Sequence, residues 1–158
     1  AASDEEAVLE YKIAEYDAFL TKQDPAFTVE ELEEAMQKVM DQYAGGIGTH
    51  YQFNEKQLAM AEEKIKKLQI LAKGLAAADM HELMFIYELK ERLTVCLTVI
   101  AHLRARKETR WHSFAENLDY PEKSDAWLCY VNSKKNGDQI TMIRRDLVKG
   151  GETYEHRD

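Results

Sequence analysis

Hydrophobic residues recur at intervals of three and four over most of the first 107 positions, the spacing of helices with one apolar face. The two clearest runs lie in residues 54–75 and 79–107. Their apolar positions are Leu58, Ala61, Ile65, Leu68, Ala72 and Leu75 in the first run, and Ile86, Leu89, Leu93, Cys96, Ile100 and Leu103 in the second. Alternation of three and four marks the seam of a helical bundle. We therefore expect an antiparallel helical hairpin, joined near residues 76–78.

Four polar residues are each followed, three positions later, by Glu or Gln, as at the start of a capped helix. The pairs are Ser3 with Glu6, Thr28 with Glu31, Asn54 with Gln57, and Asp79 with Glu82. Two further helices are thus expected, at about residues 4–22 and 28–44. Asp24-Pro25 would end the first and Gly45-Gly46 the second. Their apolar faces are Leu9, Ile13, Tyr16 and Leu20, and Leu32, Met36, Val39 and Tyr43.

The helical period disappears after Thr109. Residues 127–132 and 139–144 are rich in strand-forming side chains, and Asn136-Gly137 between them is a strong hairpin signal. We expect a small antiparallel β-hairpin that needs support from the bundle. Residues 150–158 are expected to be loose.

These elements predict a mainly α fold: a three-helix, spectrin-repeat-like, up-down bundle with an extra N-terminal helix and an irregular C-terminal tail containing a small β-hairpin. The expected regions are an N-terminal helical arm at 1–27, an antiparallel helical bundle at 28–110, and an extended tail with its hairpin packed on the bundle at 111–158. The helix at 28–44 would cover the apolar residues outside the seam, such as Phe85 and Leu97. Whether the first helix joins the bundle as a fourth member or lies outside it, against another domain, stays open.

The distribution of charged residues limits the kinds of partner that the chain can bind. The chain of 158 residues carries a formal net charge of −8, but residues 1–44 hold three Lys against twelve Asp and Glu. This acidic half argues against nucleic acid as a partner, because phosphate binding needs a basic face. It suits a solvated helical hairpin, or docking on a basic partner. No apolar run approaches the ~18 residues needed to span a bilayer, and no signal-peptide pattern is present, so no membrane insertion is expected.

The two cysteines, Cys96 and Cys129, cannot hold a four-thiolate iron–sulfur cluster, and we expect them reduced in a cytoplasmic protein. The chain starts with Ala rather than Met, which favours a piece of a longer protein.

Candidate chemistry is sparse. The basic residues Arg104, Arg106, Lys107 and Arg110 end the long helix, where cations stabilise the helix dipole; they could also form an anion site or a salt-bridged seam with a partner domain. With Trp111 and His112 they are the candidate contact residues toward another domain or subunit.

The remaining motifs give weaker indications of function. His81, His102 and His112 lack the spacing of metal ligands on one helix face. The loop Gly45-Gly46-Ile47-Gly48 follows a helix rather than a strand, so it is a helix stop and not a dinucleotide fingerprint. Trp111, Phe114, Tyr120 and Trp127 are expected to pin the tail onto the bundle rather than to stack a flavin or base. No catalytic, cofactor-binding or metal-binding residue is predicted.

One resemblance adds to this interpretation. The order Glu108, Thr109, Arg110, His112, then Asp119-Tyr120-Pro121, then Trp127 resembles the C-terminal end of the flavoprotein subunits of the succinate dehydrogenase and fumarate reductase superfamily. Within it, Thr109 and Trp111 are most similar to the adenylylsulfate reductase alpha subunits, as are residues 40–46, 51–56, 79–84 and 127–134. The chain departs from that branch at His112-Ser113, where the branch has Pro-Gly. It also lacks the Arg that the wider family carries before Asp-Tyr-Pro, and its gap from His112 to Asp119 is longer than in the succinate-type proteins.

The resemblance implies a parent enzyme with FAD and an iron–sulfur partner subunit, which in the adenylylsulfate type interconverts adenylylsulfate with sulfite and AMP. The family's flavin-binding and catalytic residues lie upstream of the matching region. The implied function is a C-terminal helical domain that covers the parent flavin domain, offers surface to the partner subunit, holds no cofactor and is inactive alone. The alternatives are a free-standing helical protein-interaction module, or the same domain from a fumarate reductase, succinate dehydrogenase or aspartate oxidase relative.

Overall fold

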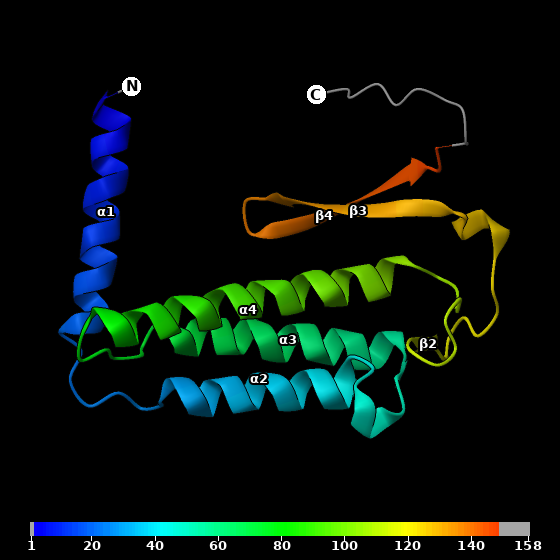
Figure 1. The fold of residues 1–158 in the computed structure, drawn as a ribbon, viewed down its shortest axis with the longest axis horizontal. Helices are drawn as coiled ribbons and strands as arrows, with labels where there is room; N and C mark the ends of the chain where they lie inside the picture. The colour runs from blue at the N-terminus through cyan, green and yellow to red at the C-terminus, as the bar shows by residue number, and fades with distance from the viewer. Residues whose placement is uncertain (1, 149–158) are drawn as a thin grey trace.

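The structure is a computed structural model that describes residues 2–148. Four helices account for most of it: α1 (Ala2–Leu20), α2 (Val29–Tyr43), α3 (Glu55–Ala72) and α4 (Met80–Ala105). Helices α2, α3 and α4 lie side by side as an up-down bundle, with α1 standing apart from them (Figure 1). The mainly α, three-helix fold with an extra N-terminal helix is therefore confirmed. The predicted loose segment, residues 150–158, lies outside the described residues.

Three of the four expected helix caps are present. Thr28 forms the complete capping box, with its hydroxyl accepting from Glu31 N and the Glu31 carboxylate accepting from Thr28 N. The side chains of Asn54 and Asp79 cap α3 and α4 by accepting from the backbone N–H groups of Gln57 and Glu82, without the reciprocal bond of a capping box. Ser3 is an exception, because α1 already begins at Ala2 and Ser3 lies inside the helix.

The core is formed where α2, α3 and α4 face one another. Its buried side chains include the whole first seam and, of the second, all but Cys96 and Leu103. They are supplied chiefly by Leu32, Met36, Leu58, Ala61, Ile65, Leu68, Leu83, Ile86, Leu89, Leu93 and Ile100. Cys96 and Leu97 are only partly buried. Phe85, which we expected α2 to cover, is 42% exposed, so that expectation is wrong. It faces away from the bundle and meets the ring of His81 edge-on.

Helix α1 touches the bundle only through its last turns. The carbonyl of Phe19 accepts from Ala77 N at 3.0 Å, and Glu15 accepts from the Tyr87 hydroxyl at 2.7 Å and from Lys90 Nζ at 2.8 Å. The first half of α1 projects away (Figure 1), so the helix is not a fourth member of the bundle. Half of its predicted apolar face is consequently in solvent: Leu9 is 61% and Ile13 49% exposed.

Two small sheets complete the fold. Strand β1 (Gln52–Phe53) pairs in parallel with β2 (Glu116–Asn117), and β3 (Cys129–Asn136) pairs antiparallel with β4 (Gln139–Asp146). The predicted hairpin is confirmed, but its two-residue loop is Gly137-Asp138, one position beyond the expected Asn136-Gly137. Of the two loop residues only Gly137 has a positive φ, +61°, as a type II′ turn requires. The β1–β2 pair was not expected from the sequence.

The hairpin lies along α4 (Figure 1), and both of its strands contact that helix. None of the helices in the described part of the chain combines the length and the hydrophobicity that a membrane span requires.

Candidate contact site around Glu108

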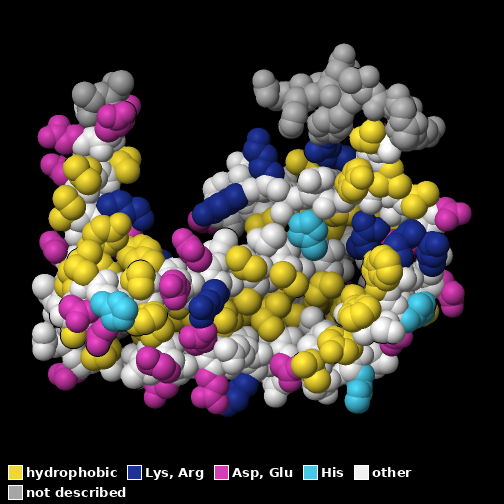
Figure 2. Space-filling view, viewed as in Figure 1, with side chains coloured by type: hydrophobic (Ala, Val, Ile, Leu, Met, Phe, Trp, Pro, Cys, Tyr) yellow, Lys and Arg dark blue, Asp and Glu magenta, His cyan; other side chains and the backbone are white. Residues whose placement is uncertain are grey.

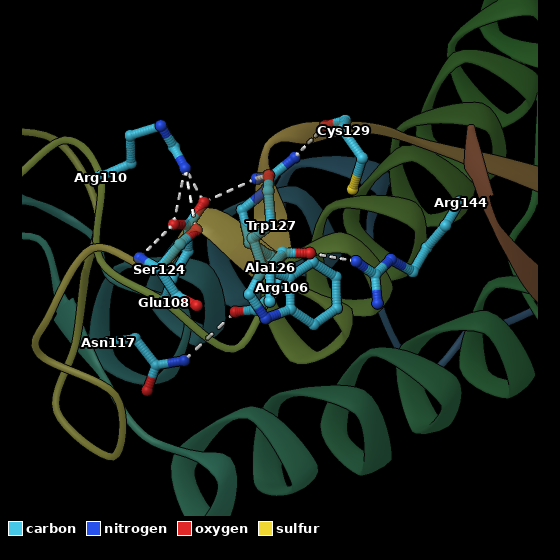
Figure 3. Close-up of polar contacts among 9 residues, drawn as sticks. All are labelled: Arg106, Glu108, Arg110, Asn117, Ser124, Ala126, Trp127, Cys129 and Arg144. Carbon is cyan, nitrogen blue, oxygen red and sulfur yellow. Dashed lines mark hydrogen bonds and ion pairs between the residues drawn. The ribbon is translucent and has the colours of Figure 1, made fainter. Parts of the chain in front are cut away.

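Glu108 lies just after α4 and is the centre of the most extensive polar cluster in the tail. Its side chain is fully buried. Arg106 Nη1 donates to Glu108 Oε1 at 2.7 Å, and Arg110 donates to both carboxylate oxygens at 2.9 Å. The backbone N–H of Ser124 donates to Oε2, also at 2.9 Å. Every oxygen of this buried carboxylate is thus satisfied by a charged or backbone donor (Figure 3).

The environment of Glu108 keeps it ionised. Burial by itself would raise the pKa of the carboxyl group, because a charge is poorly solvated inside a protein. The hydrogen bonds from Arg110, from Ser124 N and from Arg106 outweigh burial and lower the pKa of Glu108 to about 2. The cluster is therefore an ion-paired brace and not a group that exchanges protons near neutral pH.

The two arginines extend this brace toward the hairpin. Arg106 also donates to the carbonyls of Trp127 and Cys129, at 2.8 and 3.0 Å, while Arg110 donates to the carbonyl of Ser124 at 3.2 Å. Arg144 of β4 reaches back, bonding the carbonyl of Ala126 and lying 4.3 Å from the centre of the Trp127 ring. Figure 3 shows these groups converging on the start of β3.

A second set of bonds fixes the loop between the brace and β2. The buried hydroxyl of Thr109 donates to the carbonyl of Tyr120 at 2.8 Å and accepts from Asn117 N at 3.0 Å. The Asp119 carboxylate then accepts from Glu55 N, at the start of α3, at 2.7 Å. The irregular segment is therefore tied to the bundle by hydrogen bonds.

The candidate contact residues fall into two groups. The basic side chains of Arg104, Arg106 and Arg110 are engaged within the chain; Arg104 pairs with Glu55 and Glu62. Lys107, Trp111 and His112 remain at the surface. Lys107 lies 5.9 Å from the centre of the Tyr120 ring. His112 Nδ1 lies 3.3 Å from a carboxylate oxygen of Glu116.

The aromatic residues do not pin the tail as expected. Trp111 is 67% and Phe114 73% exposed, and Tyr120 is 42% exposed. Of the four, Trp127 alone is stacked within the brace, against Arg106 and Arg144. The expectation was wrong because polar groups fix this segment, which leaves the aromatic rings free to face outward.

The sequence analysis identified Glu108 only as part of the motif shared with the flavoprotein family, without a structural role. A usable signal was present, because Arg106, Glu108 and Arg110 alternate. The two arginines lie two positions on either side of the glutamate, and both reach its carboxylate. An Arg-x-Glu-x-Arg pattern just after a helix therefore predicts a cluster of the kind observed.

The site offers little for catalysis. A cavity of about 250 Å³ opens beside the brace, lined among others by Phe53, His102, Trp111 and Val131. His102 and Glu108 are its only side chains of the types used in acid–base chemistry, and Glu108 is fully occupied by its partners. Among the described residues, no three His, Cys, Asp or Glu side chains are arranged to hold a metal ion.

The glycine loop does not fit a dinucleotide cofactor. A Cβ added at Gly46 would lie 2.3 Å from Asp41 Cα, and one at Gly48 2.5 Å from an Asp41 carboxylate oxygen. These glycines allow the loop to pack on its own helix, and the loop leads from α2 into a short 3-10 turn, Ile47–Thr49. A phosphate-binding loop would instead lead from a strand into a helix. The loop at Gly45–Gly48 is therefore a helix stop and not a phosphate-binding loop.

Comparison with known proteins supplies a context for this arrangement. Residues 33–152 match the sequence profile of the family described as fumarate reductase flavoprotein C-term. The adenylylsulfate reductase subunit alpha of Megalodesulfovibrio gigas is 34% identical over 98 residues, which is 61% of this chain and 15% of that protein.

Solved structures of the same enzymes resemble this chain as well. Adenylylsulfate reductase from Archaeoglobus fulgidus superposes with a TM-score of 0.83 at 31% identity, covering 98% of this chain and 26% of that one. Quinol fumarate reductase from E. coli gives 0.74 at 18% identity, covering 95% of this chain and 26% of that one, a likeness of fold alone. The chain thus spans about a quarter or less of the length of these relatives.

Proposed function

Because the chain belongs to the family of fumarate reductase flavoprotein C-terminal domains, we propose that it is the C-terminal helical domain of an FAD-dependent oxidoreductase of the adenylylsulfate reductase alpha-subunit type. Its role is structural. It packs on the flavin domain of the parent protein and offers surface to a partner subunit, which by family resemblance is an iron–sulfur protein. The chain alone binds no FAD and has no activity.

One observation carries this proposal: the aromatic residues after α4 are exposed on a rigid support. Trp111 and Phe114 present most of their surface to solvent, yet their segment is held by the Glu108 brace and by the Thr109 bonds. Large aromatic side chains displayed on a fixed backbone are typical of the centre of a protein–protein contact, where each buries ~150–250 Å². We assign this surface to the contact with the flavin domain.

The projecting helix α1 supports the same role. Val8, Leu9 and Tyr11 are each more than 60% exposed along a helix that leaves the bundle (Figure 1). Figure 2 shows hydrophobic side chains along α1 and across the neighbouring face of the bundle. Large apolar side chains exposed on a projecting helix are typical of a surface that a further domain covers.

Sequence identity favours the adenylylsulfate type. Identity is 31–34% to the adenylylsulfate reductases and 18% to quinol fumarate reductase. The substrate of the parent follows from this preference, and assays of the full-length parent on adenylylsulfate, fumarate and aspartate test it directly.

The decisive experiment has a genetic and a biochemical part. The coding sequence upstream of Ala1 should continue the reading frame for several hundred residues and contain a glycine-rich dinucleotide motif. In the full-length protein, Trp111→Ser with Phe114→Ser should loosen the contact between the two domains, measured as faster proteolytic cleavage between them. Val95→Ser is the control, since Val95 is 60% exposed on α4 and lies outside the proposed contact.

Two results would contradict the proposal. A start codon immediately before Ala1 would favour a free-standing interaction module that binds partners through the acidic helices of residues 1–44. Stoichiometric flavin absorbance in the purified 158-residue chain would show a cofactor site that the proposal denies.

A further inference from the structure

A groove lies between the turn end of the hairpin and the exposed side of α3 and α4. Its volume is about 490 Å³. The helices line it with Lys66, Gln69, Ile70, Lys73, Lys90, Thr94, Leu97 and Thr98, and the hairpin adds Ser133, Lys135, Asp138, Gln139 and Ile140. Figure 2 shows the surface hollowed between α1 and the hairpin, with Lys and Arg side chains at the turn end of the hairpin.

The groove is basic in a chain that is acidic as a whole. It is lined by four lysines and by one acid, Asp138. Lys66 pairs with Glu62, and Lys90 with Glu15. Within residues 2–148, Lys73 and Lys135 have no carboxylate partner. Two ammonium groups therefore line the groove without an ion-pair partner among the described residues.

Lys135 is placed there by the register of the hairpin. It pairs with Ile140, and directly opposed residues of an antiparallel pair share one face. Ile140 is half-buried on the side that faces α4 and lines the groove together with Lys135. Lys73 and Lys135 are both exposed, so their ammonium groups are open to a ligand from solvent. An anionic ligand would supply the missing partner.

The floor of the groove is apolar. Ile70 is 66% exposed between the lysines, and Leu97 and Ile140 are half-buried beside it. A ligand that satisfies this surface needs apolar side chains as well as negative charge.

The groove also continues beneath the hairpin. A second cavity of about 470 Å³ shares Lys66, Leu97 and Ile140 with it and reaches Ala105 near the end of α4. From Lys90 to Ala105 the helix rises about 22 Å, the length of six to seven extended residues. The second cavity is lined by Glu62 and Asp138 as well as by Lys66 and Arg104, so the excess of basic charge lies at the turn end of the hairpin. A long, open channel of this kind fits an extended chain better than a compact small molecule.

We propose that this groove binds an extended acidic segment of a partner protein, with carboxylates at Lys73 and Lys135 and apolar side chains over Ile70 and Leu97. Backbone groups of the segment can pair with the exposed edges of the hairpin or remain solvated. The assignment goes beyond the contact with the flavin domain, because it uses a different surface and does not depend on that contact.

The test uses the 158-residue chain and a fluorescein-labelled eight-residue peptide in which Glu and Leu alternate. Binding is followed by fluorescence anisotropy at low and physiological salt. We expect saturable binding that weakens as salt rises, because the attraction is between partly exposed charges. The double variant Lys73→Glu and Lys135→Glu should weaken it at least about fivefold, since two attractions become repulsions.

A matched control makes the same change of charge at two lysines outside the groove. Lys56 and Lys123 are exposed and unpaired within the described part of the chain, and neither lines the groove. Lys56→Glu with Lys123→Glu should leave the affinity close to that of the wild type. Both double variants are checked by circular dichroism for an intact helical fold.

Other outcomes overturn the proposal. Equal weakening by both double variants would show that binding depends on the net charge of the protein and not on the groove. Unchanged binding of a peptide with Ser in place of Leu would exclude the apolar contact. Displacement of the peptide by inorganic phosphate at lower concentration than by unlabelled peptide would indicate a small-anion site, and sedimentation of the free chain as a dimer that the groove variant dissociates would show a second copy as the occupant.

Discussion

Replacing Glu108 by Gln tests whether the brace, and not hydrophobic pinning, holds the tail. The amide keeps the size of the side chain but removes its charge, and it places an N–H₂ group against the donors of Arg106 and Arg110. The buried guanidinium contacts then lose their counter-charge, a change that is strongly destabilising when it occurs inside a protein.

The magnitude follows from the pKa. Lowering the pKa of Glu108 from 4.5 to about 2 corresponds to roughly 3 kcal/mol of preference for the ionised form in the folded state. Arg106 and Arg110 are 31% and 20% exposed, so water recovers part of the loss when the charge is removed. We expect Glu108→Gln to lower the free energy of unfolding by about 2–3 kcal/mol at pH 7.

The dependence on pH gives the sharper test. Because the pKa of Glu108 is lower in the folded state than in the unfolded chain, its contribution is fully present above about pH 4.5 and is lost as the pH falls toward 2. The difference between wild type and Glu108→Gln should therefore be constant from pH 7 to 5 and shrink at pH 4 and 3. Urea unfolding followed by far-UV circular dichroism measures it.

The control is Glu34→Gln, which removes an exposed carboxylate paired with Lys38 on α2. It should leave the urea midpoint unchanged. The reasoning is refuted if Glu108→Gln unfolds at the wild-type urea concentration at pH 7, or if its deficit persists undiminished at pH 3.

Three further predictions concern the bundle and its arm. Leu93→Ala, at a fully buried seam position, should cost about 2–5 kcal/mol in urea unfolding. Gly46→Ala should destabilise by about 1–3 kcal/mol, because its Cβ would overlap the backbone of Asp41. Glu15→Gln should increase hydrogen exchange in the last turns of α1 at pH 7, because the Glu15 carboxylate anchors that helix to Lys90. The bond from Lys90 helps to lower the pKa of Glu15 to about 2. In the wild type the same increase in exchange should therefore develop as the pH falls below about 4.5.

Each of these three substitutions has a control substitution. Val95 is exposed on the same helix as Leu93, so Val95→Ala should change the free energy of unfolding by less than about 0.5 kcal/mol. Gly74→Ala meets its nearest neighbour at 3.5 Å without a positive φ, so it should be neutral or stabilising. Glu10→Gln, on the projecting part of α1, should leave exchange unchanged. A core substitution no worse than Val95→Ala, or equal effects at the two glycines, would contradict the packing described.

The helices were predictable because their signals are local. Each seam residue of α3 and α4 lies three or four positions from the next, and Thr28, Asn54 and Asp79 cap their helices with residues a single turn away. The hairpin was predictable for the same reason. Its turn was misplaced by one position, since both Asn136-Gly137 and Gly137-Asp138 suit a two-residue loop and the strand pairing selects the second.

The candidate site was predictable only in part. The resemblance marked Glu108, Thr109 and Arg110 as a unit, and the basic run drew attention to Arg106. Neither indicated that the two arginines turn inward onto one buried carboxylate, or that Trp111 and Phe114 face outward as a result. That outcome depends on Ser124 and Trp127, which reach the site from 14 to 21 positions away in the sequence.

By itself, then, the sequence determined which segments are helical, which faces of the bundle helices are apolar and where α2, α3 and α4 begin, because backbone dihedral angles and periodic side chains are set by neighbours within one turn. Only the tertiary structure decided that α1 leaves the bundle, that Gln52 pairs with Glu116 across 64 positions, and that a basic groove forms under the hairpin. These features join short segments that are distant in the chain. Their free energy comes from contacts between the segments, and no local pattern of residues records such contacts.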